Sequence, residues 1–191
     1  MKSGKRAFAE EERPELSYLH DFSCDCADPR IAEALKMLVA NWLAESPHLP
    51  HFLRGAEKEL NLTEEQGLQI KWLLALNPNT PPTVLEDLCN GATAALLERV
   101  AENPHASPET LAKLAYQAVA EIRIAVGGNI HTPLATILIL AKDDNPDVRF
   151  SLGENPYVPV EALEALTRDD NPYVRFRAER TLGRLGIGHK N

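Results

Sequence analysis

Two cysteines separated by a single residue, Cys24 and Cys26, are the best candidates for chemistry in this sequence. Thiolates and imidazoles are the usual ligands of zinc, and His20, four residues before Cys24, is a candidate third ligand. An H-x-x-H pair, His48 and His51, could complete such a site. The tight Cys-x-Cys spacing favours the alternative that no metal is bound, because structural zinc sites usually separate their cysteines by two or more residues.

The third cysteine, Cys89, is predicted to be a small buried hydrophobic residue on a helix, beside Leu85 and Leu88. Three cysteines cannot form a paired disulfide framework, and a bridge between Cys24 and Cys26 would be strained. This cysteine usage is typical of a protein of the reducing cytoplasm.

Three arginines, Arg123, Arg149 and Arg175, stand 26 residues apart (149 − 123 and 175 − 149). One interpretation is a cationic strip that binds an acidic partner. The favoured interpretation is structural, because aspartates recur in the same stretches and could pair with the arginines. These aspartates are Asp143, Asp144, Asp169 and Asp170, with Asp147 close by. A second basic cluster, of Arg175, Arg177, Arg180 and Arg184, is the one place where a nucleic-acid phosphate contact could form.

Known catalytic motifs are absent from the sequence. There is no Gly-x-Gly-x-x-Gly, Walker loop, Gly-x-Ser-x-Gly or His-Glu-x-x-His. The net charge of −8 argues against a general binder of nucleic acid. No apolar run is long enough for a membrane span, and the charged N-terminus does not resemble a secretory signal. We therefore predict a protein without catalytic activity, membrane or nucleic-acid partner.

The elements that position these residues follow from an internal repeat. Asn77, Asn103, Asn129 and Asn155 are separated by 26 residues each, and three of them precede a proline. Four units result without gaps: 77–102, 103–128, 129–154 and 155–180. Apolar residues keep the same register. They are Leu85, Leu111, Ile137 and Leu163; Leu88, Leu114, Leu140 and Leu166; and Leu96, Ile122, Val148 and Val174.

Each unit is predicted to contain two short helices. Thr80, Ser107 and Thr132 precede prolines and are candidate N-caps of the first helix. In the last two units, Asn145-Pro146 and Asn171-Pro172 mark the start of the second helix. Neither helix can bury its apolar face alone, so the units must stack.

This pattern resembles the leucine-rich repeat variant, most fully over residues 129–154 (NIHTPLATILILAKDDNPDVRFSLGE) and in part over 77–180. The resemblance implies an all-α, right-handed superhelix of alternating α and 3₁₀ helices. Some proteins with these repeats carry an N-terminal 4Fe–4S module held by four cysteines. It therefore implies a possible cluster at Cys24 and Cys26, although this chain has only three cysteines.

The flanking segments are predicted to close the array. Residues 1–16 form a charged tail, and 17–76 a helical cap with helices at about 28–45, near 51–60 and over 63–76. The last of these begins with a Thr63-x-x-Gln66 capping box. Residues 181–191 continue the last helix for a turn and then fray.

The predicted function is a non-catalytic, cytoplasmic scaffold that binds a protein or peptide partner through its stacked repeats. Arg123, Arg149 and Arg175 are the candidate partner-binding residues. The alternative is an iron–sulfur or zinc protein, with Cys24, Cys26 and His20 as ligands and a role in redox chemistry or nitrogen fixation.

Overall fold

A computed structural model describes residues 28–31, 33–34 and 61–187 of the chain, and all regular structure in these residues is helical. The chain divides into two units, residues 1–70 and 71–191. The helices are α3 (Glu64–Leu76), α4 (Pro82–Leu88), α5 (Ala94–Glu102), α6 (Pro108–Leu114), α7 (Ala120–Gly128), α8 (Leu134–Leu140), α9 (Pro146–Glu154), α10 (Val160–Leu166) and α11 (Pro172–Arg184). The predicted all-α class is confirmed for this part of the chain.

Two predicted helix starts are found in the first unit. The Asp28 carboxylate accepts a hydrogen bond from the backbone N–H of Arg30 (2.9 Å), and helical structure begins at Pro29. The capping box at α3 is also present. The Thr63 N–H donates to Gln66 Oε1 (2.9 Å), and the Gln66 N–H donates to Thr63 Oγ1 (3.2 Å). Residues 35–45 of the predicted helix of 28–45, the predicted helix near 51–60 and the tail of 1–16 lie outside the described residues.

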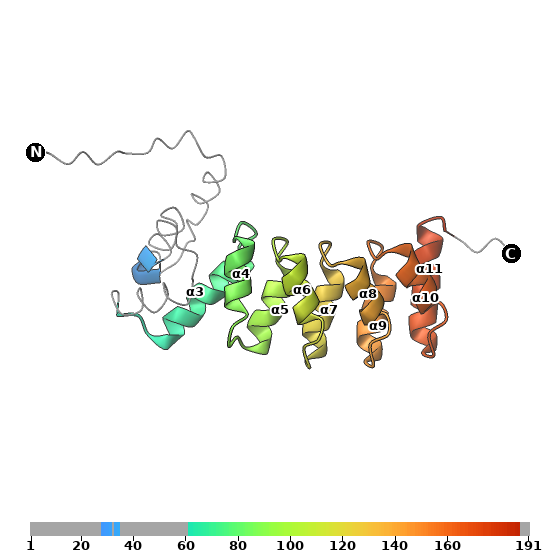
Figure 1. The fold of residues 1–191 in the computed structure, drawn as a ribbon, viewed down its shortest axis with the longest axis horizontal. Helices are drawn as coiled ribbons and strands as arrows, with labels where there is room; N and C mark the ends of the chain where they lie inside the picture. The colour runs from blue at the N-terminus through green and yellow to red at the C-terminus, as the bar shows by residue number, and fades with distance from the viewer. Residues whose placement is uncertain (1–27, 32, 35–60, 188–191) are drawn as a thin grey trace, which may run out of the picture. The chain divides into compact units, whose positions relative to one another are not determined.

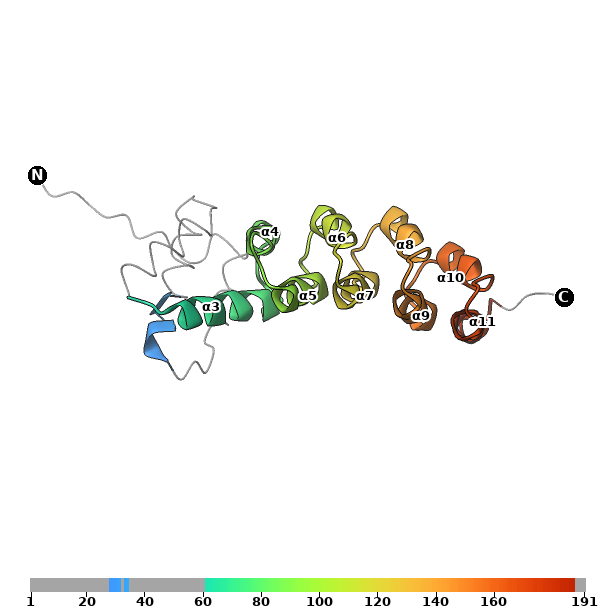
Figure 2. The ribbon, with the colours of Figure 1, turned by 90° about the horizontal axis from the view of Figure 1, so that it is seen from below.

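The second unit is built from short and long helices in alternation (Figure 1). The short helices α4, α6, α8 and α10 form one row, and the long helices α5, α7, α9 and α11 form the other (Figure 2). Each long helix packs against the next one, α5 on α7, α7 on α9 and α9 on α11. The predicted boundary between cap and repeats lies at the end of α3, whereas the two units divide within α3, between Ile70 and Lys71.

The expected 3₁₀ helices are not found in the described residues. Both helices of each pair are α-helices, of seven residues in the short row and nine in α5, α7 and α9. The short helices already close α-type bonds in their first turn, from Leu111 N–H to Ser107 O (2.9 Å) and from Ile137 N–H to Pro133 O (3.0 Å). The i→i−4 spacing of these bonds identifies α-helix rather than 3₁₀ helix.

The predicted core register agrees with the observed burial. All twelve leucine, isoleucine and valine positions assigned to the core are buried. Leu85, Leu111 and Leu163 are fully covered, and Leu140 is 1% exposed. Apolar residues at a fixed place in each unit thus line the space between the two rows of helices.

Only one of the three predicted hydroxyl caps before a proline acts as an N-cap. Ser107 Oγ accepts from the Thr110 N–H of α6 (3.1 Å). The hydroxyls of Thr80 and Thr132 instead donate to Leu74 O and Val126 O, each at 2.6 Å. These carbonyls lie in the last turn of the preceding helix, where intrahelical donors are lacking, so the hydroxyls satisfy a helix end rather than a helix start.

The repeated asparagines join neighbouring units. Asn129 Nδ2 donates to Ala101 O (2.8 Å) and to Asn103 O (2.9 Å), and its Oδ1 accepts from the His131 N–H (2.9 Å). Asn103 makes the same three bonds one unit earlier, to Ala75 O, Asn77 O and the His105 N–H. The side-chain amide therefore supplies hydrogen-bond donors to carbonyls at a helix end, which lack intrahelical donors.

Candidate interaction surfaces

The predicted metal ligands Cys24, Cys26 and His20, and the pair His48 and His51, lie outside the described residues. Within the described ranges, no three His, Cys, Asp or Glu side chains gather in a way that could hold a metal ion.

Cys89 is half-buried rather than fully buried, and its thiol donates to Leu85 O (3.3 Å). Burial, with the neighbouring Glu86 carboxylate, raises the pKa of Cys89 to about 11. The thiol is therefore protonated at neutral pH and packs as the small hydrophobic residue that the sequence predicts.

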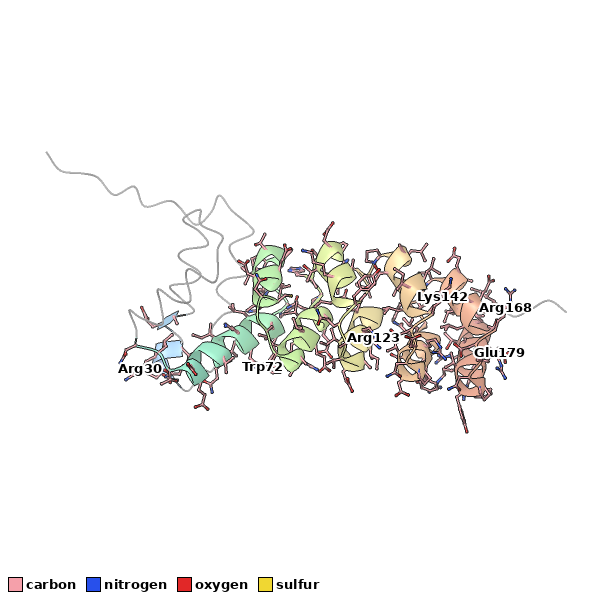
Figure 3. All side chains as sticks on the ribbon, turned by 60° about the horizontal axis from the view of Figure 1, so that its bottom comes forward. Arg30, Trp72, Arg123, Lys142, Arg168 and Glu179 are labelled. Carbon is pink, nitrogen blue, oxygen red and sulfur yellow. The ribbon has the colours of Figure 1, made fainter. Side chains whose placement is uncertain are left out.

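Two of the three recurrent arginines pair with recurrent aspartates, as the structural interpretation predicts. Arg123 lies on α7, where Figure 3 labels it. It donates from Nε and Nη2 to the two carboxylate oxygens of Asp143, at 2.6 and 2.9 Å. Its Nη1 donates to Gln117 O (2.7 Å) and Ala118 O (3.0 Å). Each guanidinium therefore joins the turn that precedes its own helix to the aspartate of the next helix pair.

Arg149 repeats this geometry one unit later. Its Nε and Nη2 donate to the Asp169 carboxylate at 2.7 and 3.1 Å. Its Nη1 donates to the backbone carbonyls of Asp143 and Asp144. The two aspartates of a turn thus act differently. The first supplies its carboxylate to the arginine of the preceding unit, and both supply backbone carbonyls to the arginine that follows.

The environment of Asp143 and Asp169 favours their charged forms. Burial acts to raise both pKa values, but the arginine hydrogen bonds and a backbone N–H, that of Asn145 or Asn171, outweigh it. The pKa values of both carboxyls therefore lie below the ordinary range for aspartate. The Asp143 and Asp169 side chains are only 9% and 6% exposed, so these bidentate pairs are shielded from solvent.

This pairing leaves Arg123 and Arg149 occupied within the array. Arg175 keeps the same contacts to its own turn, from Nη1 to Asp169 O (2.6 Å) and Asp170 O (3.1 Å). Among the described residues, no carboxylate lies within ion-pair distance of Arg175. The predicted cationic strip is thus reduced to this single arginine.

The basic cluster on α11 is partly neutralised as well. Arg177 Nη2 pairs with the Glu154 carboxylate (2.6 Å), and its guanidinium carbon lies 5.2 Å from the centre of the Phe150 ring. Arg184 donates to Thr181 Oγ1 (3.0 Å) and to Glu154 O (3.3 Å). Arg177 and Arg184 therefore stabilise the packing of α11 on α9.

A surface that the sequence analysis did not identify lies on α8. Each of the four short helices turns one side away from the long helices. On α8 the residues of this outward side are all apolar: Leu134, Ala135, Leu138 and Ile139. Leu134 and Ile139 are each 46% exposed, and Ile130 in the preceding turn is 72% exposed. Contiguous exposed apolar surface of this kind is typical of a binding site.

The same face is charged elsewhere in the row. The α4 and α6 helices are joined there by the pair Lys113 Nζ–Glu86 Oε1 (2.7 Å). The 26-residue register places Ile139 at the position of Lys113 (113 + 26) and Ala112 at that of Glu86 (86 + 26). The two positions that carry an ion pair between α4 and α6 therefore carry apolar residues on α6 and α8. The signal in the sequence was the segment LATILIL, which lacks a charge at these positions.

None of the helices in the described part of the chain is long and apolar enough to span a membrane. Comparisons of the chain with protein-family models, with curated protein sequences and with solved structures find no match.

Proposed function

We propose that this protein is a non-catalytic interaction scaffold that binds a protein or peptide partner on the outward face of α8. The observation that carries the proposal is the apolar face of Leu134, Ala135, Leu138 and Ile139 in a row whose other members are charged. Burial of these side chains against a partner would contribute about 25 cal/mol for each Å² of apolar surface removed from water.

The scaffold supports this role by its internal bonding. The asparagine amides and the arginine–aspartate pairs join successive helix pairs at fixed points. The α8 helix packs on α7 and α9, which belong to this bonded framework, and keeps its place in the row of short helices (Figure 2). A binding face on such elements is presented with little loss of conformational entropy when a partner docks.

The proposal includes the unit length and the handedness that the sequence predicts, with α-helices in place of the expected 3₁₀ helices. The helix pairs form 26-residue units of a right-handed superhelix of the leucine-rich repeat variant type. The starts of α5, α7, α9 and α11, at Ala94, Ala120, Pro146 and Pro172, support this unit length. The cysteine content supports a cytoplasmic setting, in which thiols remain reduced. The alternative iron–sulfur or zinc role rests on Cys24, Cys26 and His20, with His48 and His51 as further candidate ligands.

A double substitution tests the binding face with minimal damage to the fold. Ala112→Glu with Ile139→Lys copies onto α6 and α8 the ion pair that Lys113 and Glu86 form between α4 and α6. Full-length wild type and variant, each with an affinity tag, are used to capture partners from cells of the source organism under chemical cross-linking. Captured proteins are then quantified by mass spectrometry.

We expect a stoichiometric partner to be captured by the wild type and lost with the double variant, while circular dichroism shows an unchanged helix content. The matched control is Glu164→Lys on α10, an exposed change outside the apolar face, which should retain the partner. Equal capture by the wild type and the double variant would contradict the proposal, as would catalytic turnover by the purified chain.

A further inference from the structure

The outer face of α11, the side turned away from α9, carries Arg175. The guanidinium of Arg175 forms hydrogen bonds through Nη1 to two backbone carbonyls. Arg175 Nη1 donates to Asp169 O and Asp170 O, as Arg149 Nη1 does to Asp143 O and Asp144 O. These two bonds orient the planar group of Arg175 in the manner of its counterpart. The described residues offer no hydrogen-bond partner to Nε and Nη2 of Arg175.

In the two preceding units that edge holds a carboxylate. Arg123 binds Asp143 and Arg149 binds Asp169, each through two bonds of 2.6–3.1 Å. Within the described residues, nothing equivalent reaches Nε and Nη2 of Arg175. The molecule thus contains two occupied copies of a carboxylate site and a third copy, preformed, whose carboxylate the described residues do not supply.

A second anchor lies one residue further along α11. Phe150 on α9 is covered by the guanidinium of Arg177, at 5.2 Å from the ring centre. Phe176 occupies the same place in the next unit (150 + 26) and is 61% exposed. The two side chains that fasten one helix pair to the next, an arginine fork and an aromatic ring, are therefore both presented on α11.

Glu179 limits what can occupy this face (Figure 3). Its counterparts are Gly127 on α7 and Gly153 on α9. A Cβ atom at Gly127 would lie 2.8 Å from Leu152 Cδ2, and one at Gly153 would lie 3.4 Å from the Ala178 backbone nitrogen. Because long helices approach one another this closely, a glutamate at the same position prevents a further helix from stacking on α11 in the same way.

We propose that the outer face of α11 binds an acidic peptide segment of a partner protein. An aspartate or glutamate carboxylate of the segment is received by Nε and Nη2 of Arg175, and a neighbouring side chain covers Phe176. An extended segment fits where Glu179 excludes a closely packed helix. This site is separate from the apolar face of α8 and does not depend on it.

Nucleic acid fits this face less well. A phosphate chain needs a run of cations, whereas Arg177 is paired with Glu154, and Glu179 and Asp170 are exposed on α11 and in the turn before it. A single fork beside carboxylates selects one acidic side chain rather than a row of phosphates.

The probe is a peptide with the sequence that fills the fork of Arg149. It carries residues 167–173 (TRDDNPY), acetylated and amidated at its ends, and its control carries asparagine in place of Asp169. Full-length protein is labelled with ¹⁵N-arginine, and the Nε–Hε signals are followed by NMR during titration with each peptide. We expect the Arg175 signal to move with the aspartate peptide while the signals of Arg123 and Arg149 stay in place.

Variants test whether the peptide binds to the guanidinium of Arg175. Arg175→Ala should weaken binding roughly tenfold or more, as expected for the loss of a charge-assisted pair. Arg175→Lys keeps the charge but not the fork and should restore only part of it. Glu179→Gln should strengthen binding, because a like charge is removed. Arg180→Ala, an exposed arginine on the same helix, is the matched control and should bind as the wild type does.

Several results would overturn the proposal: no shift at millimolar peptide, equal binding of the asparagine peptide, or full binding by Arg175→Ala. Retention of duplex DNA by the wild type that is lost in Arg175→Ala would also overturn it in favour of a phosphate site. The Ala112→Glu, Ile139→Lys variant should bind the peptide normally, so failure of the α8 proposal leaves this test intact.

Discussion

The asparagine at the start of each unit should contribute to the free energy of unfolding according to the number and the length of its side-chain hydrogen bonds. Asn129 is 9% exposed and takes part in three hydrogen bonds of 2.8–2.9 Å. A net contribution of about 1 kcal/mol for each bond predicts a loss of about 3 kcal/mol for Asn129→Ala. Asn155 accepts from the Tyr157 N–H at 2.9 Å but donates only to Gly127 O, at 3.4 Å. The same reasoning predicts about 1–2 kcal/mol for Asn155→Ala.

The measurement is urea unfolding of both variants and the wild type, followed by circular dichroism at 222 nm. Asn129→Asp adds a directional check, because a carboxylate can still accept from the His131 N–H but cannot donate to Ala101 O and Asn103 O. It should therefore destabilise at pH 7 by at least as much as Asn129→Ala. If Asn155→Ala costs as much as Asn129→Ala, or if Asn129→Asp is harmless, the account of these bonds is wrong.

Four further outcomes are expected. Leu140→Ala should lower the free energy of unfolding by about 2–5 kcal/mol in urea unfolding, because a fully buried side chain is truncated. The lowered pKa of Asp143 means that its contribution is complete above the unfolded pKa of about 3.9 and is lost as the pH falls through the folded value. Asp143→Asn should therefore flatten the fall of the urea midpoint between about pH 5 and pH 2. The thiol of Cys89, with its pKa raised to about 11, should react slowly with iodoacetamide at pH 8 in the folded protein and at a normal rate in urea, as peptide mass spectrometry can show. Iron, sulfide and zinc analysis of protein purified without oxygen tests the metal hypothesis, which predicts stoichiometric metal that is lost on Cys24→Ala or Cys26→Ala.

The sequence predicted the structure best at positions where every unit needs the same kind of residue, such as an apolar residue in the core or a cap at a helix start. Positions such as Leu111 and Val148 must be apolar in every unit, so their period predicted the core, and Asn145-Pro146 predicted a capped helix start that is present. The pairing of Arg149 with a recurrent aspartate was also predictable, although the choice of Asp169 over Asp170 depends on which residue of the turn faces the neighbouring unit.

Features that depend on three-dimensional neighbours were not predictable in this way. Thr132 has the sequence context of an N-cap, but its hydroxyl reaches a carbonyl six residues earlier, because the chain turns back toward the end of α7. The exposed face of α8 was not predicted, because LATILIL carries no charged side chain to mark which residues face outward. The importance of Glu179 emerges only when the close approach at Gly153 is known.

The most direct test of the proposed function places a photoreactive group on the proposed binding face. Ile139→p-benzoylphenylalanine in the full chain, irradiated in cells of the source organism, should give a defined cross-link to one partner protein. The same residue at Glu164 on α10 should give none. A cross-link of equal yield from both positions, or from Glu164 alone, would contradict the claim that the apolar face of α8 is where this scaffold binds its partner.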